Sequence, residues 1–127
     1  MLGVAAVAAS IALGGAFFPT DDGNAGPGSL ANRFFGPNMV RAEVVLMVNG
    51  ALLDYRLDRG RIRALRNGSL ILLERDRTLV TIPLAPGADV QLNNQPVSPL
   101  ALRRGLQAVT VREGDGPAQA VYAFSRR

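Results

Sequence analysis

Arginine is the residue with the clearest chemical potential in this sequence, and it is concentrated in residues 56–66. Side chains at alternate positions of a β-strand share one face, so Arg59, Arg61 and Arg63 would form a row if the register is continuous. Such a row could bind phosphate groups or an acidic polysaccharide, with Tyr55 as a stacking neighbour. The members of the stretch are Arg56, Arg59, Arg61, Arg63 and Arg66.

The alternative is a solvated face on which nearby carboxylates balance these arginines across a hairpin, a common way to stabilise a sheet. We favour this alternative. The carboxylates are Asp54, Asp58, Glu74 and Asp76, and each has an arginine within two residues. Such pairing lowers a carboxylate pKa and works against a general acid near neutral pH.

The residue types that are missing exclude most catalytic chemistry within this chain. There is no histidine and no cysteine, and all fourteen basic residues are arginine. A Ser-His-Asp triad, a Schiff-base lysine, a P-loop lysine and a histidine-ligated zinc are therefore excluded. We expect no enzymatic activity, no cofactor and no metal site. Asp21, Asp22 and Asn24 could offer oxygens to calcium, but a calcium loop needs more ligands at fixed offsets, so a solvated turn is favoured.

The charge is unevenly distributed along the chain. Every arginine lies at or after Arg33, and from there on fourteen arginines face eight carboxylates, a net charge of +6. This excess permits binding to a polyanion without requiring it. Nucleic acid is disfavoured as a partner, because such modules interleave aromatic with basic residues and aromatics are only 6% of this chain. The tail at residues 125–127 is interpreted as a solvated terminus.

From residue 40 onward, short aliphatic runs alternate with turn signals, which predicts a small all-β domain over residues 40–127. We expect a mainly β fold, an antiparallel barrel or sandwich with one short helical turn at residues 98–104. Turns are predicted at Asn49-Gly50, at residues 58–60 and at Asn67-Gly68. The predicted strands cover residues 40–48, 51–57, 61–66, 69–74, 78–84, 89–92, 106–113 and 118–125. In the strand at 106–113, alternation predicts Val109 and Val111 inside, with Thr110 and Arg112 outside.

The first of these strands carries apolar residues on both faces. Val44, Leu46 and Val48 would line one face, and Val45 and Met47 the other. We expect this strand either to be covered on both sides within the domain or to contact another subunit.

An uncharged apolar run, residues 1–18, precedes a linker rich in Gly, Pro and Asn at residues 19–39. Small residues recur in this run at helical spacing, which favours a helix packed closely against other helices. The alternative is a signal peptide or membrane anchor, but no basic residue precedes the run and Ala-Phe-Phe-Pro is a poor cleavage site. The run is therefore either retained or follows a leader that was removed earlier. The small residues are Ala5 and Ala9 on one stripe and Ala8, Ala12 and Ala16 on the next.

An apolar N-terminal helix followed by a small β-rich head resembles the order of parts in bacterial type IV pilins and pseudopilins. The resemblance covers about the first twenty residues, and Ala5 stands where those families usually have Glu. It implies a subunit whose helix packs in a filament core.

Residues 57–124 resemble small β-barrel domains of unknown function in bacterial secreted and envelope proteins. The resemblance implies an extracytoplasmic, non-enzymatic module. It rests on Gly60-Arg61-Ile62, Asn67-Gly68, Asp89-Val90, Leu102 to Gly105, Val109 to Val111 and Val121 to Phe124.

Together these features predict a structural protein of the cell surface or extracellular space that associates with copies of itself as a filament subunit. Its mechanism would be burial of the apolar run and of the strand at residues 44–48. The alternative is a monomeric envelope module anchored in a membrane by residues 1–18, whose row of Arg59, Arg61 and Arg63 binds a polyanion.

Overall fold

The computed structural model describes Phe34 and residues 36–125, and this part of the chain is mainly β, as predicted. The predicted helix of residues 1–18 and most of the predicted linker lie outside the described residues. The elements in chain order are β1 (Arg41–Val48), β2 (Ala51–Arg66), β3 (Ser69–Glu74), β4 (Leu79–Leu92), β5 (Gln95–Pro96), the 3-10 helix η1 (Pro99–Ala101), β6 (Gln107–Glu113) and β7 (Ala118–Phe124).

Two tight hairpin turns stand where the sequence predicts them. Asn49 and Gly50 join β1 to β2 with φ of 50° and 81°, and Asn67 and Gly68 join β2 to β3 with φ of 51° and 75°. Positive φ at both central residues defines the turn type whose twist matches a hairpin, and Asn-Gly is its preferred sequence. These turns fix the register of the first three strands.

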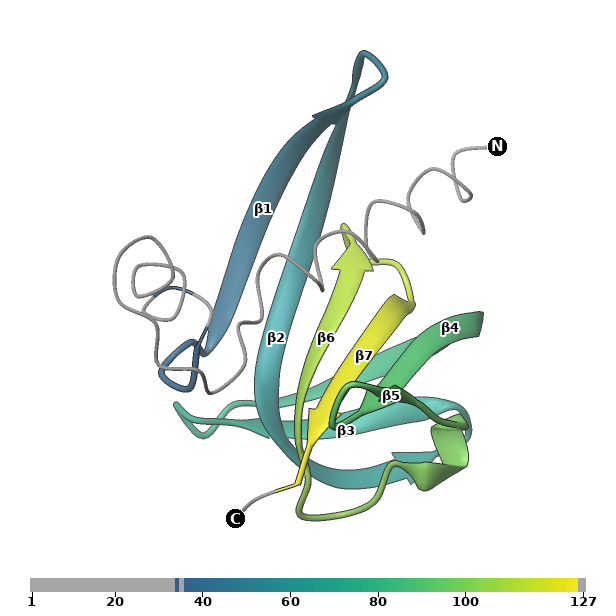
Figure 1. Ribbon diagram of the computed structural model, residues 1–127. Helices are drawn as coiled ribbons and strands as arrows, with labels where there is room; N and C mark the ends of the chain where they lie inside the picture. Colours follow the sequence, from purple (N-terminus) through teal and green to yellow (C-terminus); the bar gives the residue numbers. More distant parts are fainter. Residues whose placement is uncertain (1–33, 35, 126–127) are drawn as a thin grey trace.

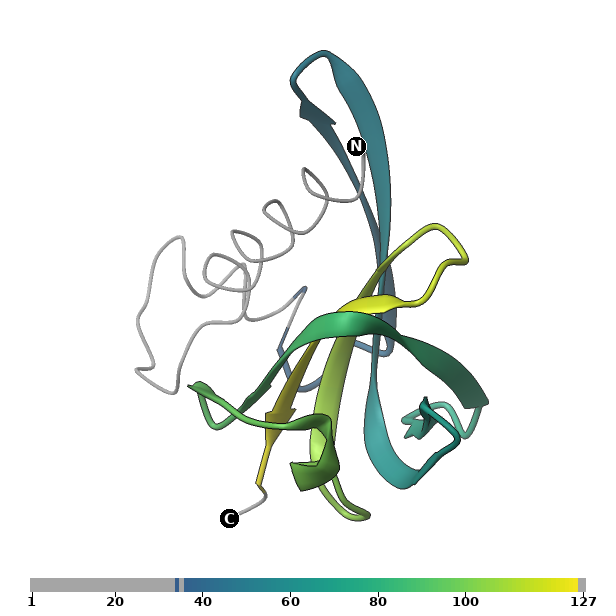
Figure 2. The ribbon, with the colours of Figure 1, turned by 90° about the vertical axis from the view of Figure 1, so that its right-hand side faces the viewer.

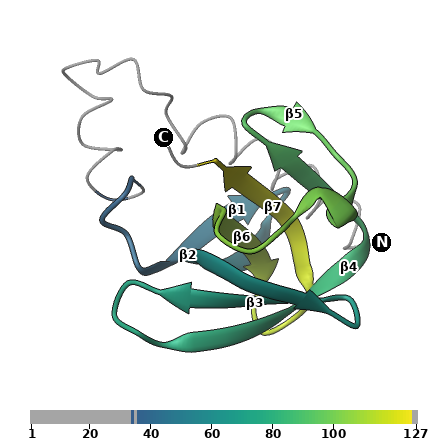
Figure 3. The same ribbon diagram turned by 90° about the horizontal axis from the view of Figure 1, so that it is seen from below.

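The strands form one sheet that closes on itself (Figure 1). Neighbours follow the order β2, β3, β4, β7 and β6, and β6 pairs again with β2. We call this ring of five strands the barrel. Figure 3 shows it from below the view of Figure 1.

The expectation of a wholly antiparallel sheet is wrong, because β4 and β7 run parallel. The other contacts around the ring, β2–β3, β3–β4, β6–β7 and β2–β6, are antiparallel. A closed ring with an odd number of strands cannot alternate in direction all the way round. One parallel contact is therefore a geometric consequence of closing five strands.

The predicted turn at residues 58–60 is also wrong, because β2 continues through it as one strand of sixteen residues. A side chain at position 60 would bring its Cβ within 2.6 Å of the Leu73 carbonyl oxygen. Gly60 is therefore needed for the close approach of β3 to β2, not for a turn. The two strands predicted at residues 78–84 and 89–92 likewise merge into β4.

Two apolar clusters hold the domain together, one on each face of the β6–β7 pair. Ala108 belongs to the cluster inside the barrel, and its neighbour Val109 belongs to the other. Thr110, predicted to face outward, is fully buried, and its hydroxyl lies 3.5 Å from the Asp58 carbonyl oxygen. Simple inside-outside alternation fails in β6 because both of its faces are covered.

The barrel cluster is built around Ile62, Leu70, Leu72, Ile82, Val90, Leu102, Leu106 and Val121. The second cluster contains Met39, Leu53, Tyr55, Leu57, Val109, Val111, Ala120 and Tyr122.

A two-stranded arm projects from the barrel (Figures 1 and 2). It consists of β1 and the first half of β2, which pair over their whole length from Arg41↔Asp58 to Val48↔Ala51. On one edge of β2, β1 pairs with the first part of the strand and β3 pairs with the second part. On the other edge, β2 pairs with β6. The arm is thus a continuation of a barrel strand and not a separate hairpin.

Candidate functional site

The arm presents two different faces. Val44, Leu46 and Val48 are half-buried and pack against the second apolar cluster. Val45 and Met47 point the other way and are 57% and 66% exposed. Leu52, which pairs with Met47, is 69% exposed. The predicted alternation of β1 is confirmed, and its outer face carries an uncovered apolar patch at the tip of the arm, formed by these last three residues.

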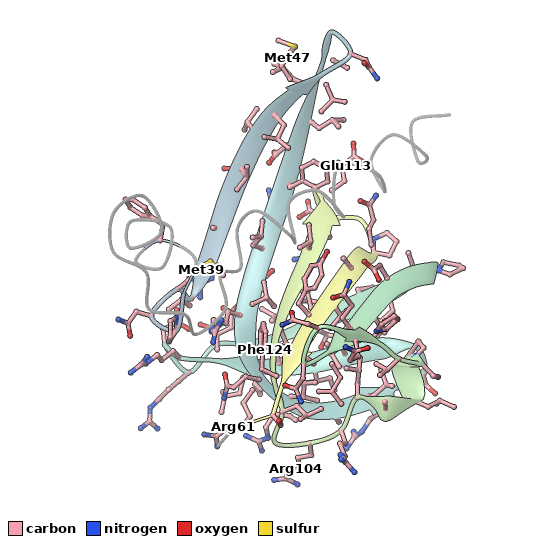
Figure 4. All side chains as sticks on the ribbon, viewed as in Figure 1. Met39, Met47, Arg61, Arg104, Glu113 and Phe124 are labelled. Carbon is pink, nitrogen blue, oxygen red and sulfur yellow. The ribbon has the colours of Figure 1, made fainter. Side chains whose placement is uncertain are left out.

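The base of the same outer face is charged. Glu43 pairs with Arg56 across the strands, and Asp54 lies opposite Val45. A hydrogen bond with Asp54 raises the pKa of Glu43. Arg56 forms an ion pair with Asp115 at 2.6 Å. The outer face therefore carries charged residues toward the barrel and apolar residues at the tip, where Figure 4 labels Met47.

One edge of β1 is open in the part of the chain that the structure describes, since β1 pairs only with β2. The Arg59 amide donates to the Val40 carbonyl at 2.9 Å. Hydrogen-bonded pairs alternate with non-bonded ones in an antiparallel ladder, so the even-numbered residues of β1 direct their backbone groups to β2. Val45 and Met47 then direct theirs to the open edge. Main-chain donors and apolar side chains are available at the same place.

An ionic cluster with buried carboxylates, Glu74 and Asp58, fixes the base of the arm to the barrel. Arg41 donates to Glu74 Oε1 at 2.8 Å and also pairs with Asp76. Glu74 is 2% exposed and lies beside buried Asp58, which is 3.9 Å from Arg112. Burial, reinforced by Asp58, raises the pKa of Glu74 to about 7, although Arg41 opposes the shift. The strand β1 is thereby held to the end of β3 through a group that titrates near neutral pH.

The predicted arginine row is only partly brought together. Arg59 is half-buried, and its guanidinium carbon lies 5.7 Å from the centre of the Phe124 ring. Arg59 and Arg61 line one hollow, whereas Arg63 stands at the register shift between β2 and β3 and does not line it. The break in register is the reason that the three do not act as one row.

Two other expectations about the row are wrong. Tyr55 is fully buried in the second cluster, so its ring does not offer a stacking surface to a ligand. The carboxylates expected to balance the row pair elsewhere: Glu74 and Asp76 with Arg41, and Asp58 with Arg112. The arginines beside the hollow are left without these partners.

The hollow contains residues that the sequence did not indicate as a site. Arg75 and Arg77, in the turn after β3, line it together with Arg59 and Arg61. The signal was present as the charged turn Arg75-Asp76-Arg77, but nothing in the sequence placed that turn beside residue 59.

Other candidate residues fall outside the structure or lack the features of a site. Ala5, Ala8, Ala9, Ala12, Ala16 and the acidic turn at residues 21–24 lie outside the described residues. Within the described residues, no group of three or more acidic, histidine or cysteine side chains is arranged to hold a metal ion. No helix in residues 36–125 is long and apolar enough to cross a membrane.

Comparisons of the chain with protein families, with curated proteins and with solved structures give no match.

Proposed function

We propose that this protein is a structural subunit that associates with copies of itself, in the form of a filament at the cell surface. The apolar run of residues 1–18 packs with other copies in a shared core, and the β head lies outside. The arm joins neighbouring heads. The observation that carries the proposal is the tip of the arm, where a strand edge that is unpaired among the described residues coincides with exposed Val45, Met47 and Leu52.

The open edge favours pairing with the same strand of a second copy. An exposed and regular edge strand is a template for another strand unless proline, a bulge or a charge blocks it. Residues 44–48 contain none of these blocking features. Association through this edge would satisfy the outward backbone groups of Val45 and Met47 and cover their side chains in one step.

One register fits this pairing best. In an antiparallel pair centred on Leu46, Val44 faces Val48 of the second copy, and Val45 faces its Met47. Every cross-strand neighbour in residues 44–48 is then apolar, while Glu43 and Arg41 stay outside the apolar part. Cross-strand apolar pairs contribute about 0.2–1 kcal/mol each beyond an alanine pair. Such a contact is weak alone and gains strength when the helices of residues 1–18 hold many copies together.

The test compares two double variants of the full chain by electron microscopy and sedimentation velocity. Val45→Lys with Met47→Lys places two charges on the apolar tip, and we expect regular assembly to be lost. Leu79→Lys with Leu100→Lys is the matched control, because both residues are exposed, by 60% and 87%, and lie off the arm. The control should assemble like the parent chain.

Regular assembly by the arm variant would overturn the role of the arm. Ala12→Arg tests the apolar run separately, and we expect it to abolish assembly while the circular dichroism of the head is unchanged. The alternative of a membrane-anchored module is the outcome if the parent chain is recovered only as single copies in detergent.

A further inference from the structure

A hollow at the base of the arm gathers four arginines from two separate parts of the chain. It has a volume of about 620 Å³ and lies where β2 bends past the end of β3 and the start of β6. Arg59 and Arg61 come from β2, and Arg75 and Arg77 from the turn after β3. Met39 and Arg61, which both line it, lie far from Met47 at the tip of the arm (Figure 4).

No ion pair among the described residues neutralises the arginines of this hollow. The ion pairs within the described residues involve Arg41, Arg56 and Arg112, and none of the four arginines of the hollow. Glu74 is the single carboxylate that lines the hollow, and its Oε1 is occupied by Arg41 at 2.8 Å. Among the described residues, the hollow is therefore lined by four arginines and by one carboxylate that is already paired with Arg41.

Two of the arginines are held in place. Arg59 lies over the Phe124 ring and is half-buried. Arg75 donates to the Asn38 side-chain oxygen at 2.9 Å and to the Pro37 carbonyl at 3.3 Å. Burial, together with the charge of Arg75, lowers the pKa of Arg59, so the two guanidinium groups repel each other at this site. A bound anion would remove this repulsion, and the fixed side chains would lose little entropy on binding it.

We propose that this hollow binds a phosphate group carried by a larger ligand. Guanidinium groups present planar pairs of N–H donors that match the oxygens of a phosphate, and several of them suit a doubly charged group better than a carboxylate. The volume exceeds that of phosphate alone and falls in the range of ligand pockets, so the hollow also accommodates what the phosphate is attached to. The site is separate from the arm tip and does not depend on the proposed assembly.

The test measures binding of glycerol phosphate to the full chain by calorimetry at constant ionic strength, with acetate as the comparison anion. We expect glycerol phosphate to bind and acetate to bind at least tenfold more weakly. Arg61→Gln with Arg77→Gln should weaken glycerol phosphate binding at least tenfold. Within the described residues, neither side chain makes a hydrogen bond, an ion pair or a ring contact that its loss would disturb.

The matched control is Arg63→Gln with Arg66→Gln, which removes the same charge from exposed positions outside the hollow. It should change the affinity by less than twofold. Equal losses in the two double variants would show general attraction to a basic surface and overturn the proposal. A parent chain that binds neither glycerol phosphate nor vesicles containing phosphatidic acid would also overturn it.

A second probe distinguishes a lipid headgroup from a soluble ligand as the source of the phosphate. Vesicles of phosphatidylcholine with phosphatidic acid test a lipid headgroup, and glycerol phosphate tests a soluble ligand. Binding of the parent chain to either, lost in Arg61→Gln with Arg77→Gln, supports the site and identifies the source. Assembly measured on the same variant should be unchanged, so a failure here is distinguishable from a failure of the arm.

Discussion

The barrel and the arm are built from the same kinds of residue, but they use them differently. In the barrel every strand of the ring has a neighbour on both sides, and Ile62, Leu70 and Leu72 are fully buried. In the arm, the described residues give β1 a neighbour on one side only, and two of its six apolar side chains, Val45 and Met47, face outward. Most large apolar residues of the barrel lie in its core, with Leu79 as an exposed exception, whereas Val45, Met47 and Leu52 are gathered in one exposed patch on the outer face of the arm.

This difference shows that a strand with apolar residues on both faces can have one of two structural roles. In β6 both faces are covered by the two clusters of the same domain. In β1 one face packs on the second cluster and the other is uncovered among the described residues. Periodicity alone describes both strands in the same way, and only the tertiary arrangement separates a core strand from a surface that suits a partner.

The most direct test of this contrast is to make the same type of substitution, leucine to alanine, once in each region. Leu72→Ala removes a fully buried side chain from the barrel core, and we expect a loss of about 2–5 kcal/mol in the free energy of unfolding. Leu52→Ala removes a side chain that is 69% exposed, and we expect a change within about 0.5 kcal/mol. Chemical denaturation of the full chain at low concentration measures both.

A comparable loss for Leu52→Ala would contradict the division, because it would mean that the outer face of the arm is covered in the single chain. A small effect of Leu52→Ala on stability, together with weakened assembly, would support the division between the barrel core and the outer face of the arm.

The sequence predicted local structure better than the connections between distant segments. The turns at Asn49-Gly50 and Asn67-Gly68 were correct because a turn of two residues is decided by the residues in it. The turn expected at Asp58 to Gly60 was wrong because the need for Gly60 comes from Leu73, a neighbour in space. The parallel contact of β4 with β7 follows from closure of the whole ring and has no local signal.

The same limit applies to the candidate sites. The two-faced strand at residues 44–48 could be predicted because its residues are adjacent. The hollow could be predicted only in part, since Arg59 and Arg61 stand in the predicted row but Arg75 joins them through the packing of β3 on β2. Charge patterning along the chain does not show which of many arginines will lack a counter-charge after folding.

The ionic contacts between the base of the arm and the barrel should make the stability of the protein depend on pH through Glu74. Its pKa is raised from 4.5 to about 7 by burial and by Asp58, so the folded state binds more protons than the unfolded state between these values. Stability should then fall as pH rises through that window, by about 1–3 kcal/mol. Denaturation midpoints of the full chain at intervals from pH 4.5 to pH 8 measure this slope.

Glu74→Gln should flatten the slope, because the amide keeps an oxygen for Arg41 and has no proton to lose. Asp76→Asn is the control. In the parent chain, the hydrogen bond from Arg41 lowers the pKa of Asp76. The contribution of Asp76 to stability is therefore lost only at pH values below the window in which Glu74 titrates. A slope that persists in Glu74→Gln would mean that another group couples the arm to the barrel.

The smallest effect is expected at an exposed ionic contact between the arm and the β6–β7 turn. Arg56 and Asp115 lie 2.6 Å apart, but their side chains are 45% and 82% exposed. A double-mutant cycle with Arg56→Gln and Asp115→Asn should give a coupling below about 0.5 kcal/mol, because water screens an exposed pair and ordering two side chains costs entropy. A coupling above about 1 kcal/mol would mean that surface charge helps to fix the direction of the arm. The expected weak coupling leaves that task to the buried contacts of Glu74 and to the inner face at Val44 and Leu46.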